Sequence, residues 1–94
     1  MRIDERLRAI TAEIKSLQTE AAILDEQVAF QTEVAEDARI RALVSETPLA
    51  DREAREARQD LERLERSRGE TRERLERLRG EQDRLLEQLA ARGR

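Results

Sequence analysis

The sequence predicts an all-α fold: a long antiparallel two-helix coiled-coil hairpin, in one domain over residues 1–94, that pairs with a second copy as a four-helix bundle. Three observations predict this fold class. Apolar residues recur every three or four positions, helix-forming residues dominate the composition, and Pro48 is the only proline. We expect a first helix over residues 3–44, a turn over 45–48 and a second helix over 48–91.

The first helix is predicted from an apolar repeat that begins at Ile3 and steps alternately by four and three residues. A repeat of about 3.5 residues is typical of a coiled-coil seam, the line along which two helices pack. Eleven of its twelve positions are apolar, the exception being Gln31. The positions are Ile3, Leu7, Ile10, Ile14, Leu17, Ala21, Leu24, Val28, Gln31, Ala35, Ala38 and Ala42.

The turn is predicted where this repeat stops, at residues 45–48. Proline is unfavourable inside a helix but fits the first turn of a new one, so Pro48 indicates where the second helix begins. Thr47 is then the expected N-cap. Asp51 and Glu53 are expected near the positive end of the second helix dipole.

The second helix carries its own seam with the same repeat. Nine of its twelve positions are apolar, the exceptions being Arg68, Thr71 and Gln82. The positions are Ala50, Ala54, Ala57, Leu61, Leu64, Arg68, Thr71, Leu75, Leu78, Gln82, Leu85 and Leu89. If the chain folds back at Pro48, facing positions add up to 92, so that Ile14 faces Leu78 and Ala42 faces Ala50.

The four polar seam positions have two interpretations. Gln31, Arg68, Thr71 and Gln82 either specify the register at some cost in stability or mark a region that opens easily. Gly69 would lie opposite the small residues at positions 21 and 22, so a bend in this region is one outcome to test.

A second apolar stripe flanks the first seam. It consists of Ile23, Gln27, Phe30 and Val34, and it contains the only aromatic residue of the chain. Acidic residues surround it, since no basic residue occurs between Lys15 and Arg39. A helix that is apolar over this width is expected to contact more than one neighbour. The stripe therefore predicts a homodimer contact, with a docking face for another protein as the alternative.

The turn region predicts a second candidate surface, the hairpin tip. Apolar residues cluster there, and they either pack over the turn as a cap or stay exposed as a small patch beside acidic residues. The candidate tip residues are Val44, Glu46, Thr47, Pro48, Leu49, Asp51 and Glu53, with Ile40 and Leu43 next to them.

Composition excludes several function classes. The chain has no His, Cys, Trp or Tyr, so we expect no enzyme activity, no transition-metal site and no cofactor. A net charge of −3 gives no general attraction to nucleic acid or to anionic lipid. The longest apolar run, Ala21–Leu24, is too short to span a membrane, and a cytoplasmic location is expected.

The acidic tip at Glu46, Asp51 and Glu53 is similar in outline to that of Gre-type transcript factors, which insert a coiled-coil hairpin into RNA polymerase. The tRNA-binding arm of seryl-tRNA synthetase is a similar hairpin, although this chain lacks its basic excess. These resemblances are of shape alone.

The leading hypothesis is an interaction module that binds itself and unidentified partner proteins. The alternatives are a regulator that inserts its acidic tip into a nucleic-acid machine and a small subunit of a larger assembly.

Overall fold

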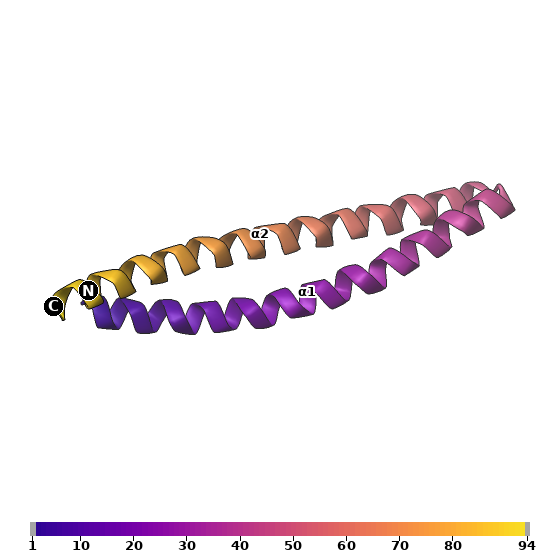
Figure 1. Ribbon diagram of the computed structural model, residues 1–94. Coiled ribbons are helices and arrows are strands. Elements are labelled where there is room, and N and C mark those ends of the chain that lie inside the picture. The colour runs from indigo at the N-terminus through magenta and orange to yellow at the C-terminus, as the bar shows by residue number, and fades with distance from the viewer. Residues whose placement is uncertain (1, 94) are drawn as a thin grey trace. The chain divides into compact units, whose positions relative to one another are not determined.

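The computed structural model describes residues 2–93, and two α-helices account for nearly all of them (Figure 1). Helix α1 comprises Ile3–Ser45 and helix α2 comprises Pro48–Arg92, with 43 and 45 residues. The described residues contain no strand. The predicted all-α antiparallel helical hairpin is therefore confirmed, and both predicted helices end within one residue of the observed bounds.

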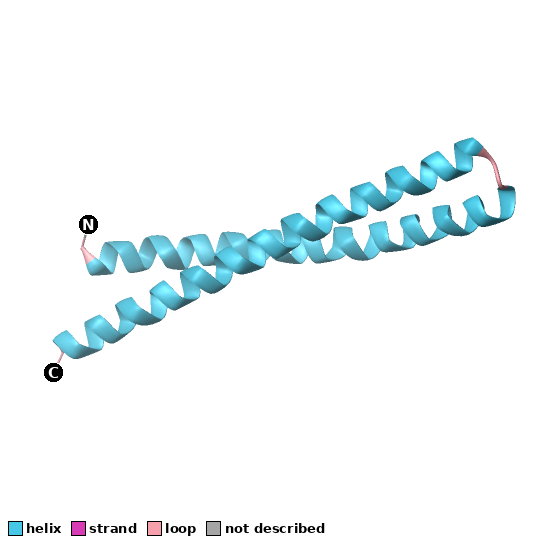
Figure 2. Ribbon diagram, turned by 90° about the horizontal axis from the view of Figure 1, so that it is seen from above, coloured by secondary structure: helices cyan, strands magenta, loops and turns pink. Residues whose placement is uncertain are grey.

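The turn between the helices consists of two residues, Glu46 and Thr47 (Figure 2). Glu46 has a φ of 52°, and its N–H donates to the carbonyl of Ala42 at 3.1 Å. This is the left-handed arrangement that commonly ends a helix. The hydroxyl of Thr47 accepts a hydrogen bond from the N–H of Ala50 at 3.1 Å, which confirms Thr47 as the N-cap of α2.

The contacts within the chain divide it into two compact units. Unit 1 comprises Met1–Ala21 and Glu70–Arg94, and unit 2 comprises Ala22–Gly69 with the turn. The division falls beside Gly69 and between Ala21 and Ala22. In this region α1 contributes a small seam residue and α2 contributes the polar seam residues Arg68 and Thr71. That the chain behaves as a single domain stays a prediction.

The core of unit 1 is a cluster of large aliphatic side chains from both helices. Ile10 is fully buried, and it lies with Ile14, Leu75 and Leu78 in one cluster. Leu17, Ala21 and Leu85 pack against that cluster. The cluster contains the expected facing pair of Ile14 and Leu78, so the packing agrees with the register expected from the sequence.

The core of unit 2 is built from smaller residues. Leu24, Val28, Ala38 and Ala57 are its buried apolar residues. Because alanine has a short side chain, the two helix backbones can approach closely where alanines face each other. The same short side chains leave a shallow hollow beside the seam, lined in part by Ala35 and Ala54.

The seam positions behave as the repeat predicts. All twenty-four are buried or half-buried, including the four polar ones. The amide of Gln31 donates to the carbonyl of Ala57 at 3.0 Å in unit 2, and the amide of Gln82 donates to the hydroxyl of Thr11 at 3.2 Å in unit 1. Thr71 is buried, with 7% of its surface exposed. No buried side-chain nitrogen or oxygen among residues 2–93 lacks a hydrogen-bond partner, so the polar seam positions leave no unmet polar group.

Candidate interaction surfaces

The first candidate surface is the predicted side face of α1, here called the Phe30 face: Ile23, Gln27, Phe30 and Val34. Phe30 is 68% exposed and Ile23 is 49% exposed. Gln27 is also exposed, whereas Val34 is half-buried. Helical spacing places these residues on one side of the α1 seam in unit 2. The face is therefore an uncovered apolar strip with Phe30 at its centre.

A shallow groove lies beside Phe30. It is lined by Glu26, Gln27, Phe30, Gln31 and Leu64. Leu64 comes from α2, so the groove joins the two helices of unit 2. Glu26 adds a carboxylate at its edge. The Phe30 face is consequently apolar in the middle and acidic at its border.

The second candidate surface is the hairpin tip in unit 2. Val44, Leu43 and Leu49 are 80%, 65% and 64% exposed, and Ile40 is 46% exposed. Glu46, Asp51 and Glu53 are exposed next to them. Of the two outcomes expected for these apolar residues, the structure favours the patch, because a cap over the turn would have covered them.

A third surface was not expected from the sequence and is here called the arginine groove. It lies on unit 2, has a volume of about 340 Å³ and joins α1 to α2. Its lining residues are Thr32, Ala35, Glu36, Arg39, Ala54, Arg55, Arg58 and Leu61. The small side chains of Ala35 and Ala54 leave the hollow, and Leu61 adds apolar surface. Three arginines line it against Glu36, and Glu62 pairs with Arg58 beside it, so its rim carries a small excess of positive charge.

Ion pairs hold the rim of the arginine groove. The guanidinium of Arg39 contacts both carboxylate oxygens of Glu36, at 2.7 and 3.1 Å, and Arg58 pairs with Glu62 at 3.4 Å. The hydrogen bonds from Arg39 lower the pKa of Glu36, and the same contact raises the pKa of Arg39. Both pairs are exposed, so the arginines remain reachable from solvent.

The arginine groove had a signal in the sequence that the prediction did not use. Arg39 directly follows seam residue Ala38, and Arg58 directly follows seam residue Ala57. In an antiparallel pair, residues that follow seam positions in this way lie on the same flank of the two helices. Two arginines facing each other across small seam residues therefore pointed to a basic hollow on that flank.

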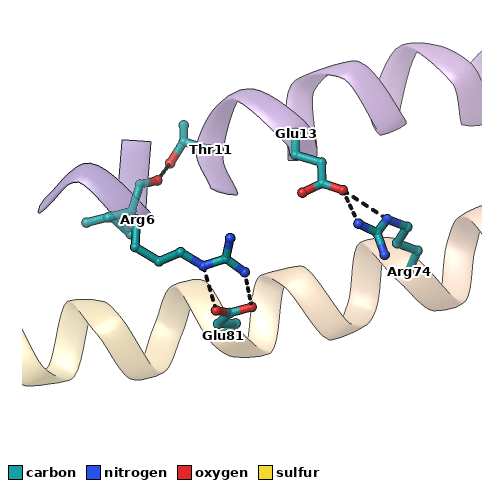
Figure 3. Close-up of polar contacts among 6 residues, drawn as sticks. Arg6, Thr11, Glu13, Arg74 and Glu81 are labelled. Carbon is teal, nitrogen blue, oxygen red and sulfur yellow. Dashed lines mark hydrogen bonds and ion pairs between the residues drawn. The ribbon is translucent and has the colours of Figure 1, made fainter. Parts of the chain in front are cut away.

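Unit 1 carries two ion pairs between its helices (Figure 3). Arg6 donates two hydrogen bonds to the carboxylate of Glu81, at 3.0 and 3.1 Å, and Arg74 pairs with Glu13. The hydrogen bonds from Arg6 are the main reason why the pKa of Glu81 is lowered, and the same contact raises the pKa of Arg6. The polarity reverses between the two pairs, since the arginine comes first from α1 and then from α2.

These ion pairs border an open groove on unit 1 whose charges are balanced. Its charged lining residues are four arginines and three glutamates, so positive and negative charges nearly cancel: Arg6, Arg74, Arg77, Arg84, Glu73, Glu76 and Glu81. Two of these arginines, Arg6 and Arg74, pair with acids of the same unit (Figure 3). The ion pairs at this groove are therefore best explained as contacts that fix the register of α1 against α2 in unit 1.

No group of three or more acidic, histidine or cysteine residues within residues 2–93 is placed to hold a metal ion. The described helices also lack an apolar stretch that would cross a membrane. No protein-family model, curated protein or solved structure matches this chain. The three surfaces of unit 2 remain the candidate interaction sites.

Proposed function

We propose that this chain is a non-enzymatic protein–protein interaction module that associates with itself and docks or spaces partner proteins. The observation that carries the proposal is the exposure of Phe30, at 68%, on a face that also exposes Ile23. Large aromatic side chains that remain in water are a recurrent feature of protein interfaces, because covering them removes apolar surface from solvent. A homodimer in which two hairpins form a four-helix bundle is the predicted assembly.

Self-association also fits the small core of each hairpin. Each unit buries only a few large side chains, and Ile10 is the only large one that is fully buried among residues 2–93. Short two-stranded helical structures gain stability when a further helix covers their uncovered side. A second copy that covers Phe30 and Ile23 would supply this contact.

The hairpin tip supports a second candidate, in which the chain is a regulator that inserts its tip into a larger machine such as RNA polymerase. This candidate is favoured by the exposure of Leu43, Val44 and Leu49 beside three acidic residues. Loops and tips are common recognition sites because few of their groups are engaged within the protein. The tip and the Phe30 face do not share a residue, so the two candidates can be separated by substitution.

The test compares the solution mass of the native chain with that of three variants by light scattering at several concentrations. Phe30→Glu places a charge at the centre of the Phe30 face and is expected to weaken self-association at least about 30-fold, the loss typical of a central interface residue. Circular dichroism should show that the variant stays helical. Val44→Glu changes the tip, and Leu86→Glu changes a leucine of unit 1 that is 48% exposed.

The expected result is that only Phe30→Glu lowers the solution mass. A native chain that is folded and monomeric at all concentrations would contradict self-association. Loss of self-association in Val44→Glu, with Phe30→Glu unaffected, would move the contact to the tip. A binding partner that is retained by Phe30→Glu and lost by Val44→Glu would support the second candidate.

A further inference from the structure

Two surfaces of unit 2 have complementary shapes. The Phe30 face presents a ring that is 68% exposed, and the arginine groove presents a hollow of about 340 Å³, more than ten times the space that one water molecule occupies (~30 Å³). The floor of the groove includes Ala35, Ala54 and Leu61, which are apolar. An aromatic ring would therefore find apolar contact in the groove.

The same two surfaces have complementary charge. The groove is rimmed by three arginines, Arg39, Arg55 and Arg58. Glu36 and Glu62 pair with two of them, so the rim keeps a small excess of positive charge. Exposed carboxylates, by contrast, border Phe30. The bordering acids are Glu26, Glu33 and Asp37. Arginine also stacks favourably against aromatic rings, so a basic rim suits both the ring and the acids around it.

The two surfaces lie on opposite flanks of the hairpin. They share no lining residue. At 100° per residue, Phe30 and Gln27 project to one side of the α1 seam and Thr32 and Arg39 project to the other side. One copy of the chain therefore offers an acidic ring-bearing flank and a basic hollow flank at the same time.

A contact between two Phe30 faces would place like charges together. It would bring Glu26, Glu33 and Asp37 of one copy toward the same acids of the other copy. Like charges that meet at an interface weaken it, whereas opposite charges favour encounter and fix the register. Docking of the Phe30 face into the arginine groove avoids this repulsion. It also covers an apolar hollow that the hairpin leaves open.

We propose that the Phe30 face of one copy of this chain docks into the arginine groove of a second copy. This inference rests on the self-association in the proposed function and states which surfaces meet. Because the surfaces are unlike and lie on opposite flanks, each contact leaves one flank free on either copy. Such head-to-tail contacts continue to longer assemblies unless they close into a ring, so the dimer is the first step.

The experiment mixes two variants of the full chain, each of which lacks one of the two surfaces. Phe30→Glu removes the ring and keeps the groove. The double variant Arg55→Glu, Arg58→Glu reverses the groove rim and keeps the ring, and both of its positions are exposed. Each variant alone is expected to associate at least about 30-fold more weakly than the native chain.

The decisive result is the behaviour of the equimolar mixture. One intact ring and one intact groove remain, so the mixture should form a one-to-one complex and nothing larger. The native chain should instead increase in mass beyond the dimer as its concentration rises. A control with the same charge change, Arg66→Glu with Arg92→Glu, alters arginines outside the groove and should associate like the native chain.

Two failures have different meanings. A native chain that never associates would overturn the proposed function as well as this inference. A native chain that associates, together with a groove variant that associates equally well and a mixture that forms no complex, would overturn this inference alone. That second result would indicate that self-association occurs through a contact between two Phe30 faces.

Discussion

At the scale of single residues, the turn depends on two neighbours with opposite backbone roles. Glu46 lies in the left-handed region, with a φ of 52°, where a side chain crowds the backbone. The hydroxyl oxygen of Thr47 accepts a hydrogen bond from the N–H of Ala50 and thereby satisfies one of the free backbone donors at the start of α2. Glu46 is thus a source of strain and Thr47 a source of stability.

Replacing Glu46 by glycine should relieve this strain. We expect Glu46→Gly to raise the free energy of unfolding by about 0.5–1 kcal/mol, because glycine adopts positive φ without a Cβ clash and its greater freedom when unfolded offsets part of the gain. Urea denaturation measures the effect. Glu46→Ala keeps the Cβ and removes the same carboxylate, so it should not reproduce the gain. Equal effects of the two substitutions would show that charge, and not backbone strain, is responsible.

At the scale of the helices, ion pairs of alternating polarity join α1 to α2 in unit 1. Arg6 binds Glu81, and one heptad later Glu13 binds Arg74. A shift of one helix against the other by a heptad would place Arg6 opposite Arg74 or Glu13 opposite Glu81. Charge therefore opposes a shift of one heptad in either direction, which the apolar repeat alone would tolerate.

The Arg6–Glu81 pair makes stability depend on pH in a defined direction. The pKa of Glu81 is lowered in the folded protein from an ordinary value of 4.5. Its contribution is therefore present above about pH 4.5 and is lost as the pH falls below that value and Glu81 becomes protonated. At pH 7 we expect Glu81→Gln to be less stable than the native chain.

The stability difference between Glu81→Gln and the native chain should then shrink as the pH is lowered through the acid range. Urea denaturation at a series of pH values measures this difference. Glu87→Gln is the matched control, because it changes an exposed carboxylate of α2 outside the two ion pairs. A difference for Glu81→Gln that stays constant with pH would contradict an ionic role of Glu81.

At the scale of the whole molecule, the question is whether the two units unfold together. Gly69 belongs to unit 2 and Gly80 to unit 1. A Cβ added at Gly69 would meet nothing within 4 Å, and one at Gly80 would make an ordinary contact of 3.5 Å with the side chain of Arg84. Alanine therefore fits at both positions.

We expect Gly69→Ala and Gly80→Ala each to raise the free energy of unfolding by about 0.5–1 kcal/mol, because alanine favours a helix over glycine. If the hairpin is one domain, as the sequence predicts, both substitutions shift the same cooperative transition. Thermal unfolding followed by circular dichroism tests this expectation. Two transitions, with each substitution moving only one of them, would contradict the single-domain prediction.

The sequence by itself determined the helices, the turn and the seam. The 3.5-residue repeat, Pro48 and Thr47 act over a few neighbouring residues, so their consequences follow from local geometry. It also marked the Phe30 face, although Val34 proved half-buried. These features required no knowledge of which flank of one helix meets which flank of the other.

Only the tertiary structure decided what the paired helices leave uncovered. It left Val44 and Leu49 in solvent, gave Gln31 its hydrogen bond to the carbonyl of Ala57, and opened the hollow at Ala35 and Ala54. The physical reason is that exposure and hollow space are set by both helices together. A repeat along one helix records which side chains turn inward, whereas a groove depends on the size of the side chains opposite.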